Sequence, residues 1–489
     1  MKPQVTLRRA LTDPALLGSV LGGNSWRGWR ALLIAAMGEQ LTEAERETFK
    51  ALTGRDREPG QRVEELFGVI GRRGGKSRAI SALAAYIAGL CDHSDVLAPG
   101  ERGVALLIAP DQRQAAITLD YCTAAFEATP IMRQLIAGRT ADTLTLTTGI
   151  AVEVRAASFR RLRGPTFVTV IADEAAFWHD ESSANADTDI LNAVRPGLST
   201  TRGPLVVISS PYARRGEVWA TYKAHFGPTG DRLILVAQGA SRDLNPTLPQ
   251  SVVDRAMARD PAAASAEYGA QFRTDLEAFV SREAVEACVS PGEFERAPVP
   301  GITYAAFTDP SGGSADSMTL AVGHQRDDVV VIDALRERKA PFNPEEAVHE
   351  FASLLASYRI TRVVGDRYAG EWPREQFRKR SIDYELSPKP KSDVYKDLLP
   401  ALNSGKLDLL DSPRLVHQLV SLERRTARGG RDSIDHPPNA HDDLANAVAG
   451  LVATVGMSTG SYDATLSWVG EYDEREWRAA RLRSQLYGG

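Results

Sequence analysis

Short apolar runs alternate with segments of helical spacing along most of the chain. In the first half, runs typical of buried strands occur at residues 66–70, 103–110, 167–172 and 204–208. Helical spacing covers residues 27–53, 78–88 and 112–127. Alternating positions at 143–147 and 151–154 flank Thr148-Gly149 and predict a hairpin. This order favours an α/β domain with a mainly parallel sheet covered on both faces.

A second α/β block follows a segment rich in proline and glycine. Its first strand signals lie at 302–307, 318–323 and 329–332, with a turn at 310–313. The polar end of the chain has a charged helical pattern at 471–486. We therefore expect a first domain over 1–275, a linker over 276–301, a second domain over 302–456 and a C-terminal tail over 457–489.

The turn after the first of these strands carries the most specific motif. It reads Gly71-Arg72-Arg73-Gly74-Gly75-Lys76-Ser77 and leads into a helical segment. Its glycines allow backbone N–H groups to converge on an anion at the start of a helix. We interpret it as a Walker A P-loop for ATP, in which Lys76 reaches the β- and γ-phosphates and Ser77 holds Mg²⁺. Ile70 stands where the usual pattern has a glycine, and a helix start with a surface lysine is the open alternative.

Two further strand ends carry polar residues that we expect at the same edge of the sheet. Asp173 and Glu174 end the strand at 167–172 and form a candidate Walker B motif. Asp173 would bind Mg²⁺, and Glu174 would activate the water that attacks the γ-phosphate. Ser209 and Ser210 end the next strand and are candidates to couple phosphate loss to a neighbouring segment. Helix capping and a simple turn are the structural alternatives for these two motifs.

Arginines are candidates for stabilising charge on the transferring phosphoryl group. Arg72 lies inside the loop and could act within its own subunit. Arg163 precedes Gly164, and we expect the side chain to project toward a neighbouring subunit. A solvated basic loop, or one that contacts DNA phosphates, is the alternative for Arg163.

Aspartates of the second block fall at the ends of different elements. Asp309 ends a strand, Asp366 ends a later strand, and Asp442 and Asp443 open a C-terminal helix. This is a ribonuclease-H-like arrangement, although each aspartate alone is also typical of a strand end or helix cap. Converging carboxylates cannot all stay ionised without cations. We therefore expect two Mg²⁺ or Mn²⁺ ions there, which would support hydrolysis of phosphodiesters.

Composition restricts the partners and the cellular compartment. The formal net charge of −5 means that nucleic acid must bind to local basic patches. The candidates for DNA contact are Arg378, Lys379, Arg380, Lys389, Lys391, Lys396, Arg424, Arg425, Arg428 and Arg431. The three widely spaced cysteines argue against a disulfide framework or a zinc cluster. The sequence has no signal-peptide core and no apolar stretch of membrane-spanning length, so we expect a protein that is neither secreted nor in a membrane.

The ordered set of motifs resembles the large terminase subunit of tailed bacteriophages. The resemblance covers about residues 25–455. Besides residues 71–77 and Ile171-Ala172-Asp173-Glu174, it rests on Arg163-Gly164, Ser209-Ser210-Pro211, Thr308-Asp309-Pro310, Gly365-Asp366-Arg367-Tyr368 and His441-Asp442-Asp443-Leu444. It implies a P-loop packaging ATPase domain with a mainly parallel sheet, followed by a ribonuclease-H-like nuclease domain with a mixed sheet.

The resemblance also implies a function and partners. Such a subunit hydrolyses ATP to move double-stranded DNA into a procapsid and cuts concatemeric DNA with two divalent metal ions. The implied partners are double-stranded DNA, the portal protein, the small terminase subunit and further copies in a ring, expected to be a pentamer, on the portal. The implied location is the host cytoplasm during virion assembly.

Individual roles follow from the same resemblance. Arg72 and Arg163 match the family's cis and trans arginines, and 209–211 match its coupling motif. The nuclease ligands fall on Asp309, Asp366 and the pair Asp442-Asp443, with the main ligand of that pair left open. Candidates for adenine contact are Trp26, Trp29 and Gln40.

Two other classes of protein remain as alternatives. One is a helicase-type or repair-type motor whose second domain binds DNA without cutting it. The other is a non-enzymatic DNA-binding assembly protein, which does not require Lys76 or Glu174, although both are present. A transposase or integrase could share the carboxylates but would lack the ATPase block.

Overall fold

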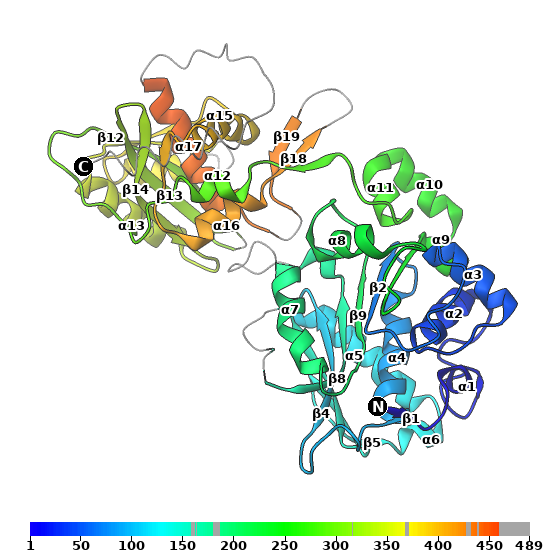
Figure 1. The fold of residues 1–489 in the computed structure, drawn as a ribbon. Helices are drawn as coiled ribbons and strands as arrows, with labels where there is room; N and C mark the ends of the chain where they lie inside the picture. Colours follow the sequence, from blue (N-terminus) through cyan, green and yellow to red (C-terminus); the bar gives the residue numbers. More distant parts are fainter. Residues whose placement is uncertain are drawn as a thin grey trace, which may run out of the picture.

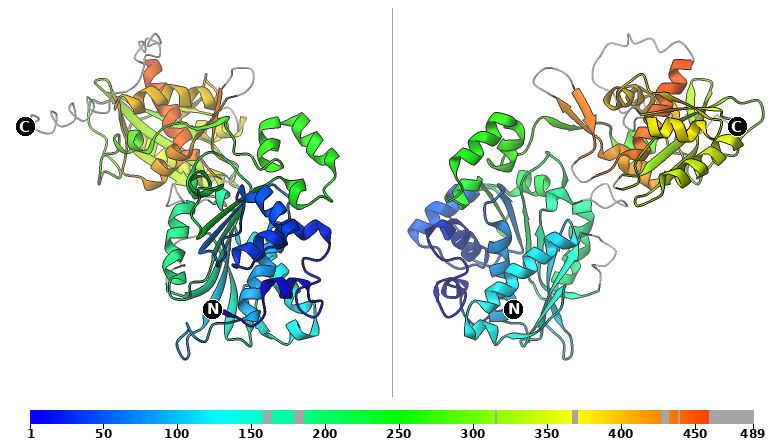
Figure 2. Two further views of the ribbon diagram at one scale, coloured as in Figure 1. Left: turned by 45° about the vertical axis from the view of Figure 1, so that its right-hand side comes forward. Right: turned by 180° about the vertical axis from the view of Figure 1, so that it is seen from behind.

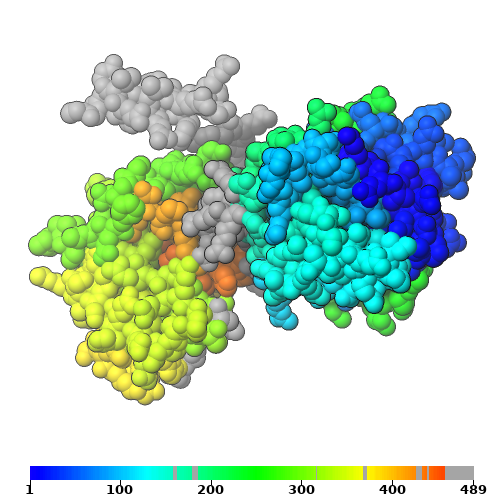
Figure 3. Space-filling view, turned by 90° about the horizontal axis from the view of Figure 1, so that it is seen from below, coloured from blue at the N-terminus to red at the C-terminus, as the bar shows by residue number. Residues whose placement is uncertain are grey.

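The computed structural model describes residues 1–157, 162, 164–178, 186–314, 316–366, 371–426, 432–437 and 440–458. The chain forms two α/β domains, the first in blue to green and the second in yellow-green to orange (Figure 1). Seen from below, the two halves are separate lobes (Figure 3).

An eight-stranded, mainly parallel sheet forms the centre of the first domain, as predicted. In spatial order its strands are β10 (Ile234–Gly239), β2 (Glu65–Ile70), β9 (Leu205–Ser209), β8 (Thr166–Asp173), β4 (Gly103–Ala109), β7 (Ile150–Ala156), β6 (Thr143–Leu146) and β5 (Ile136–Arg139). The strands from β10 to β7 are parallel, whereas β6 and β5 are antiparallel to their neighbours. The hairpin expected around Thr148-Gly149 is the β6–β7 pair.

Helices cover both faces of this sheet because successive residues of its buried strands point to opposite sides. Leu66 and Ile70 of β2 lie in one core cluster, and Phe67 and Val69 lie in the other. The first cluster includes residues of α2 (Arg27–Ala36), α3 (Glu43–Thr53), α4 (Lys76–Leu90) and α5 (Gln112–Glu127). The second includes residues of α7 (Ala186–Leu198) and α8 (Gly216–His225).

Smaller elements complete the first domain. They are β1 (Lys2–Pro3), α1 (Leu7–Thr12), η1 (Asn24–Trp26), β3 (Cys91–Asp92), α6 (Pro130–Arg133), η3 (Ala175–Phe177), α9 (Ser241–Leu244), α10 (Gln250–Arg259) and α11 (Pro261–Glu267).

Cys91, Cys122 and Cys288 are buried and free. Over the described ranges, we find no helix with the length and apolar character needed to cross a membrane.

A six-stranded mixed sheet forms the second domain, again as predicted. Its order is β16 (Asp383–Leu386), β15 (Arg362–Gly365), β12 (Tyr304–Asp309), β13 (Met318–Arg326), β14 (Val329–Arg338) and β17 (Leu407–Asp408). Strands β12, β13 and β14 form an antiparallel meander, and β15 is parallel to β12. The carboxyl ends of β12 and β15 therefore meet at one edge of the sheet.

Helices also cover both faces of the second sheet. One face packs on α15 (Lys391–Asn403), α16 (Pro413–Ser421) and α17 (Asp443–Ser458), and the other on α13 (Pro344–Ser357) and α14 (Glu371–Arg378). Helix α17 approaches the sheet closely, since a Cβ at Gly450 would lie 2.4 Å from the ring of Phe307. This packing carries the start of α17 to the edge where β12 and β15 end.

The segment expected as a linker is partly folded. β11 (Leu276–Ala278) pairs with β18 (Glu423–Thr426), which also pairs with β19 (Asp432–Asp435). α12 (Arg282–Glu286) packs on α16, and Phe279 and Val285 lie in the core of the second domain. Such short elements are not visible as periodicity in a sequence. The predicted helix at 471–486 lies outside the described residues.

Candidate functional site

Residues 71–75 form the turn between β2 and α4, and Lys76 and Ser77 begin the helix, as the sequence predicts. Three side chains from elsewhere hold the carbonyl groups of this turn. Trp29 Nε1 donates to Gly74 O at 2.7 Å, and Ser241 Oγ donates to Arg72 O at 2.6 Å. Asn245 Nδ2 donates to Arg73 O at 2.8 Å. The loop is thus fixed by three residues outside the motif, of which the sequence indicates only Trp29, and that one as a candidate for adenine contact.

The position of the first glycine in the loop has a packing reason. A Cβ at Gly71 would lie 2.5 Å from Ser241 Oγ and 2.7 Å from Ser241 N. Ile70 is fully buried in the core of the first domain. The glycine is therefore needed at 71, where the chain passes Ser241, and an apolar side chain suits position 70.

The serine of the candidate Walker A motif and the aspartate of the candidate Walker B motif are in contact. Ser77 Oγ donates to Asp173 Oδ2 at 2.8 Å. The other oxygen, Asp173 Oδ1, is buried and has no hydrogen-bond partner. Burial raises the pKa of the Asp173 carboxyl, and the neighbouring Glu174 adds to this effect. A hydroxyl and a buried carboxylate with an unused oxygen fit a hard cation such as Mg²⁺.

Lys76, Glu174 and Ser210 form the second cluster at this edge. Lys76 Nζ lies 3.2 Å from Glu174 Oε1 and donates to Ser210 Oγ at 2.7 Å. Ser210 N donates to Glu174 Oε2 at 3.1 Å. Ser209 Oγ also contacts this carboxylate, at 3.4 Å. The three motifs converge because β2, β9 and β8 are adjacent parallel strands whose carboxyl ends share one edge.

The other residues predicted for the nucleotide site have mixed outcomes. Arg72 is exposed and pairs with Glu267 at 3.0 Å. Trp26 packs beside Gly75, with the guanidinium of Arg78 5.1 Å from its ring centre. Gln40 lies beyond the far end of α2, so it is not grouped with the tryptophans at the loop. Arg163 lies outside the described residues.

In the second domain, the structure brings the predicted aspartates to one place. Asn446 Nδ2 of α17 donates to Asp309 Oδ2 at 2.7 Å and to Asp366 Oδ2 at 3.4 Å. The pKa of Asp309 is raised to about 8, chiefly by burial and then by the charges of Asp366, Asp443 and Asp442, against the opposing hydrogen bond from Asn446. Asn446 thus holds Asp309 and Asp366 at the edge of the sheet where β12 and β15 end.

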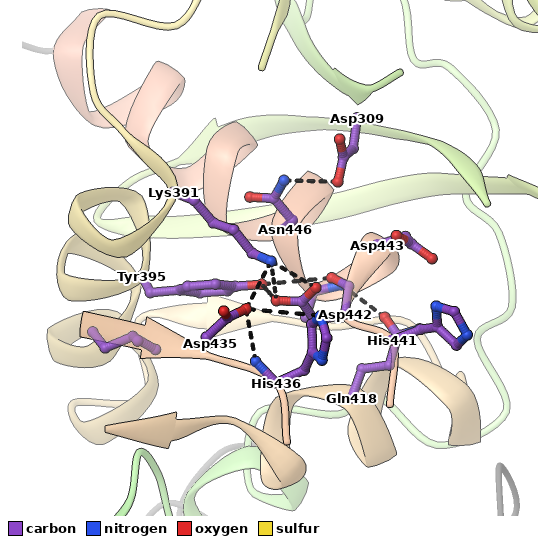
Figure 4. Close-up of polar contacts among 12 residues, drawn as sticks. Asp309, Lys391, Tyr395, Gln418, Asp435, His436, His441, Asp442, Asp443 and Asn446 are labelled. Carbon is purple, nitrogen blue, oxygen red and sulfur yellow. Dashed lines mark hydrogen bonds and ion pairs between the residues drawn. The ribbon is translucent and has the colours of Figure 1, made fainter. Parts of the chain in front are cut away.

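Asp442 and Asp443 point in different directions (Figure 4). Asp442 accepts hydrogen bonds from Lys391 Nζ at 2.9 Å and from the Tyr395 hydroxyl at 2.7 Å. Asp443 Oδ2 is buried without a hydrogen-bond partner, and burial raises the pKa of this carboxyl. Asp443 also has a larger effect than Asp442 on the pKa of Asp309. Asp443 is therefore the member of the pair with an oxygen available to a cation.

Lys391 anchors a polar cluster beside the aspartates (Figure 4). Its ammonium bonds Asp435 at 3.1 Å as well as Asp442, and these carboxylates outweigh burial and raise the pKa of Lys391 to about 12. Asp435, His436 and Asp442 each place one ligand atom within 4.8 Å of the others. Since the Lys391 ammonium already bonds both carboxylates of this group, we do not assign a metal to it. Tyr395 and Asn446 carry no motif that the sequence reveals, and the sequence indicates only a DNA contact for Lys391.

The basic residues expected to contact DNA are mostly ion-paired. Acidic partners are present for Lys379, Lys389, Lys391, Lys396, Arg424 and Arg425. Arg378 is exposed, whereas Arg428 and Arg431 lie outside the described residues. Pairing lowers the positive potential that these side chains could offer to phosphates.

Together, the two edges define a two-domain α/β chain with a P-loop site and a separate carboxylate site. No protein-family model and no curated protein sequence matches this chain. Among solved structures it is similar to the HK97 bacteriophage large terminase, with 15% identity and a TM-score of 0.38 over 88% of this chain and 99% of that chain. It is also similar to a full-length large terminase from a thermophilic bacteriophage, with 12% identity and a TM-score of 0.37 over 80% and 94% of the chains. The large terminase nuclease from the thermophilic phage G20c matches 35% of this chain and 95% of its own, with 16% identity and a TM-score of 0.32.

Proposed function

We propose that this protein is the large terminase subunit of a DNA-packaging motor, which hydrolyses ATP to move double-stranded DNA and cuts it by metal-dependent hydrolysis. The observation that carries the proposal is that Asn446 of α17 bonds both Asp309 and Asp366, in a chain whose other domain joins Lys76 to Glu174. A motor that only binds DNA has no need for carboxylates brought together in this way.

At the first site, ATP would bind with its phosphates at the turn 71–77. Lys76 would contact the β- and γ-phosphates, and Ser77 with Asp173 would hold Mg²⁺. Glu174 accepts the proton of the attacking water as the water oxygen bonds the γ-phosphorus and ADP leaves. Ser210 bonds both Lys76 and Glu174, which places the proposed coupling motif in direct contact with the catalytic groups.

At the second site, Asp309, Asp366 and Asp443 would hold divalent metal ions. Their oxygen donors fit Mg²⁺ or Mn²⁺. Such ions, when bound, activate water and stabilise the leaving oxygen of a phosphodiester. Asn446 holds Asp309 and Asp366 in place, while Lys391 and Tyr395 hold Asp442 to one side.

The remaining assignments belong to the same proposal. The subunit would act as a ring on the portal protein together with the small terminase subunit, in the host cytoplasm. Arg163 would reach the site of a neighbouring subunit, and Arg72 would act within its own. Arg72 must leave Glu267 to do so, which an exposed ion pair permits at small cost.

The test is an assay of the full chain for both activities. We expect ATP hydrolysis that needs Mg²⁺ and plasmid cutting that needs Mn²⁺ or Mg²⁺ without ATP. Cutting that persists in excess chelator would point to a contaminant, and hydrolysis without any cutting would favour the helicase-type alternative.

Asn substitutions at the two neighbouring aspartates should have different effects. Asp443→Asn should abolish cutting and the thermal stabilisation of the protein by Mn²⁺, because it alters the carboxylate that has a buried oxygen without a hydrogen-bond partner. Asp442→Asn should retain the stabilisation by Mn²⁺, since Lys391 and Tyr395 already occupy that carboxylate. Melting curves with and without Mn²⁺ measure the difference. The reverse pattern would assign the metal to Asp442.

A further inference from the structure

A wholly buried carboxylate, Glu423, lies where the two domains meet. Glu423 of β18 is 0% exposed. It accepts a hydrogen bond from the Tyr212 hydroxyl at 2.6 Å and pairs with Arg215. Tyr212 and Arg215 belong to the first domain and Glu423 to the second. Because a buried charge that loses its partners is strongly unfavourable, this contact fixes β18 on the first domain.

The partners of Glu423 are connected to the nucleotide site. Tyr212 follows Ser210 by two residues, and Ser210 bonds Lys76 and Glu174. The Tyr212 ring also packs on Phe177, with 5.3 Å between ring centres. Phe177 ends η3, the turn that begins directly after Glu174. Tyr212 is therefore connected to the candidate coupling motif through the chain and to the candidate Walker B strand through Phe177.

On its other side, Glu423 is connected to the carboxylate site. The register of β18 and β19 places Glu423 opposite Asp435. Asp435 accepts a hydrogen bond from Lys391, which also bonds Asp442. In both Figure 1 and Figure 2, β18 and β19 lie on the side of the second domain that is nearer to the first. A shift of β18 would therefore reach Lys391 through a single strand pair.

We propose that Glu423 is a positioning residue through which nucleotide binding at the first site changes the rate of DNA cutting at the second. The inference rests on the proposed function, since it needs both activities. If residues 209–215 move when phosphates bind, Glu423 must move with them or lose Tyr212 and Arg215. A packed, buried contact of this kind switches between discrete arrangements.

The experiment measures plasmid cutting by the full chain in Mn²⁺, with and without a non-hydrolysable ATP analogue, so that turnover plays no part. In the wild type we expect the saturating analogue to change the cutting rate by about fivefold or more, the size of a typical coupling between sites. Tyr212→Phe keeps the ring on Phe177 and removes the hydroxyl. It should cut like the wild type without the analogue and lose the response to it.

A matched control separates the interdomain contact from general effects. Tyr222→Phe removes another tyrosine hydroxyl, which bonds Gln238 within the first domain, and should keep the wild-type response. An unchanged response in Tyr212→Phe would overturn the inference, as would a wild type that hydrolyses ATP and cuts DNA without any response to the analogue. In both cases the proposed function stands. A wild type that never cuts would overturn the proposed function and this inference together.

Discussion

Replacing Glu174 by glutamine should lower the kcat of ATP hydrolysis by about 10²–10⁴-fold, the usual contribution of a general base. The amide has nearly the same shape and can still accept the hydrogen bond from Ser210 N, but it cannot take a proton from water. Lys76 loses an ionic partner at 3.2 Å and keeps Ser210. ATP binding should therefore survive, and steady-state hydrolysis with a parallel nucleotide-binding assay measures both.

A control variant and a control activity test whether the loss of turnover is specific to Glu174. Glu153→Gln makes the same change on β7 of the same domain, where the carboxylate pairs with Arg155, and should retain turnover. Cutting of plasmid in Mn²⁺ should persist in Glu174→Gln, since the carboxylate site lies in the other domain. Full ATP turnover by Glu174→Gln would remove Glu174 from the proposed mechanism.

The nucleotide site could be predicted from the sequence because its residues follow strands. The carboxyl ends of adjacent parallel strands share one edge, so motifs at 71–77, 173–174 and 209–210 converge wherever such a sheet forms. The same reasoning places Asp309 and Asp366 together. The residues that brace these motifs, such as Ser241 and Asn245, come from short loops and helices whose position depends on the whole packed domain.

The roles of some residues in the second domain could not be predicted either, because they depend on contacts between elements far apart in the sequence. Asp442 and Asp443 both precede Asn446 by about one helical turn. Helical periodicity therefore cannot tell which of the two is the better candidate for a metal ligand. In the structure, Lys391 and Tyr395 of α15 bond the Asp442 carboxylate, and this favours Asp443 as the candidate ligand. Glu423 looks like one more charged residue before a basic run, and its burial depends on strand pairing and on contacts with Tyr212 and Arg215 that the sequence does not reveal.

Replacing Asp309 by asparagine should abolish DNA cutting and raise the melting temperature of the metal-free protein. The pKa of Asp309 is raised to about 8, chiefly by burial and then by Asp366, Asp443 and Asp442. Between the unfolded pKa of about 4 and this value, the folded state binds more protons, so its stability falls as pH rises. Asparagine removes that loss and can still accept from Asn446 Nδ2.

We expect Asp309→Asn to melt at a higher temperature than the wild type and to cut no DNA. The gain in melting temperature, about 2–4 °C for each kcal/mol, should be larger at pH 8 than at pH 5 and be measured in chelator. Mn²⁺ should stabilise the wild type and leave Asp309→Asn unchanged, because metal ions relieve the same repulsion that the amide removes. Asp383→Asn, an exposed change on the edge strand β16, should alter neither property. Undiminished cutting by Asp309→Asn would show that hydrolysis takes place without this carboxylate and would contradict the proposed nuclease site.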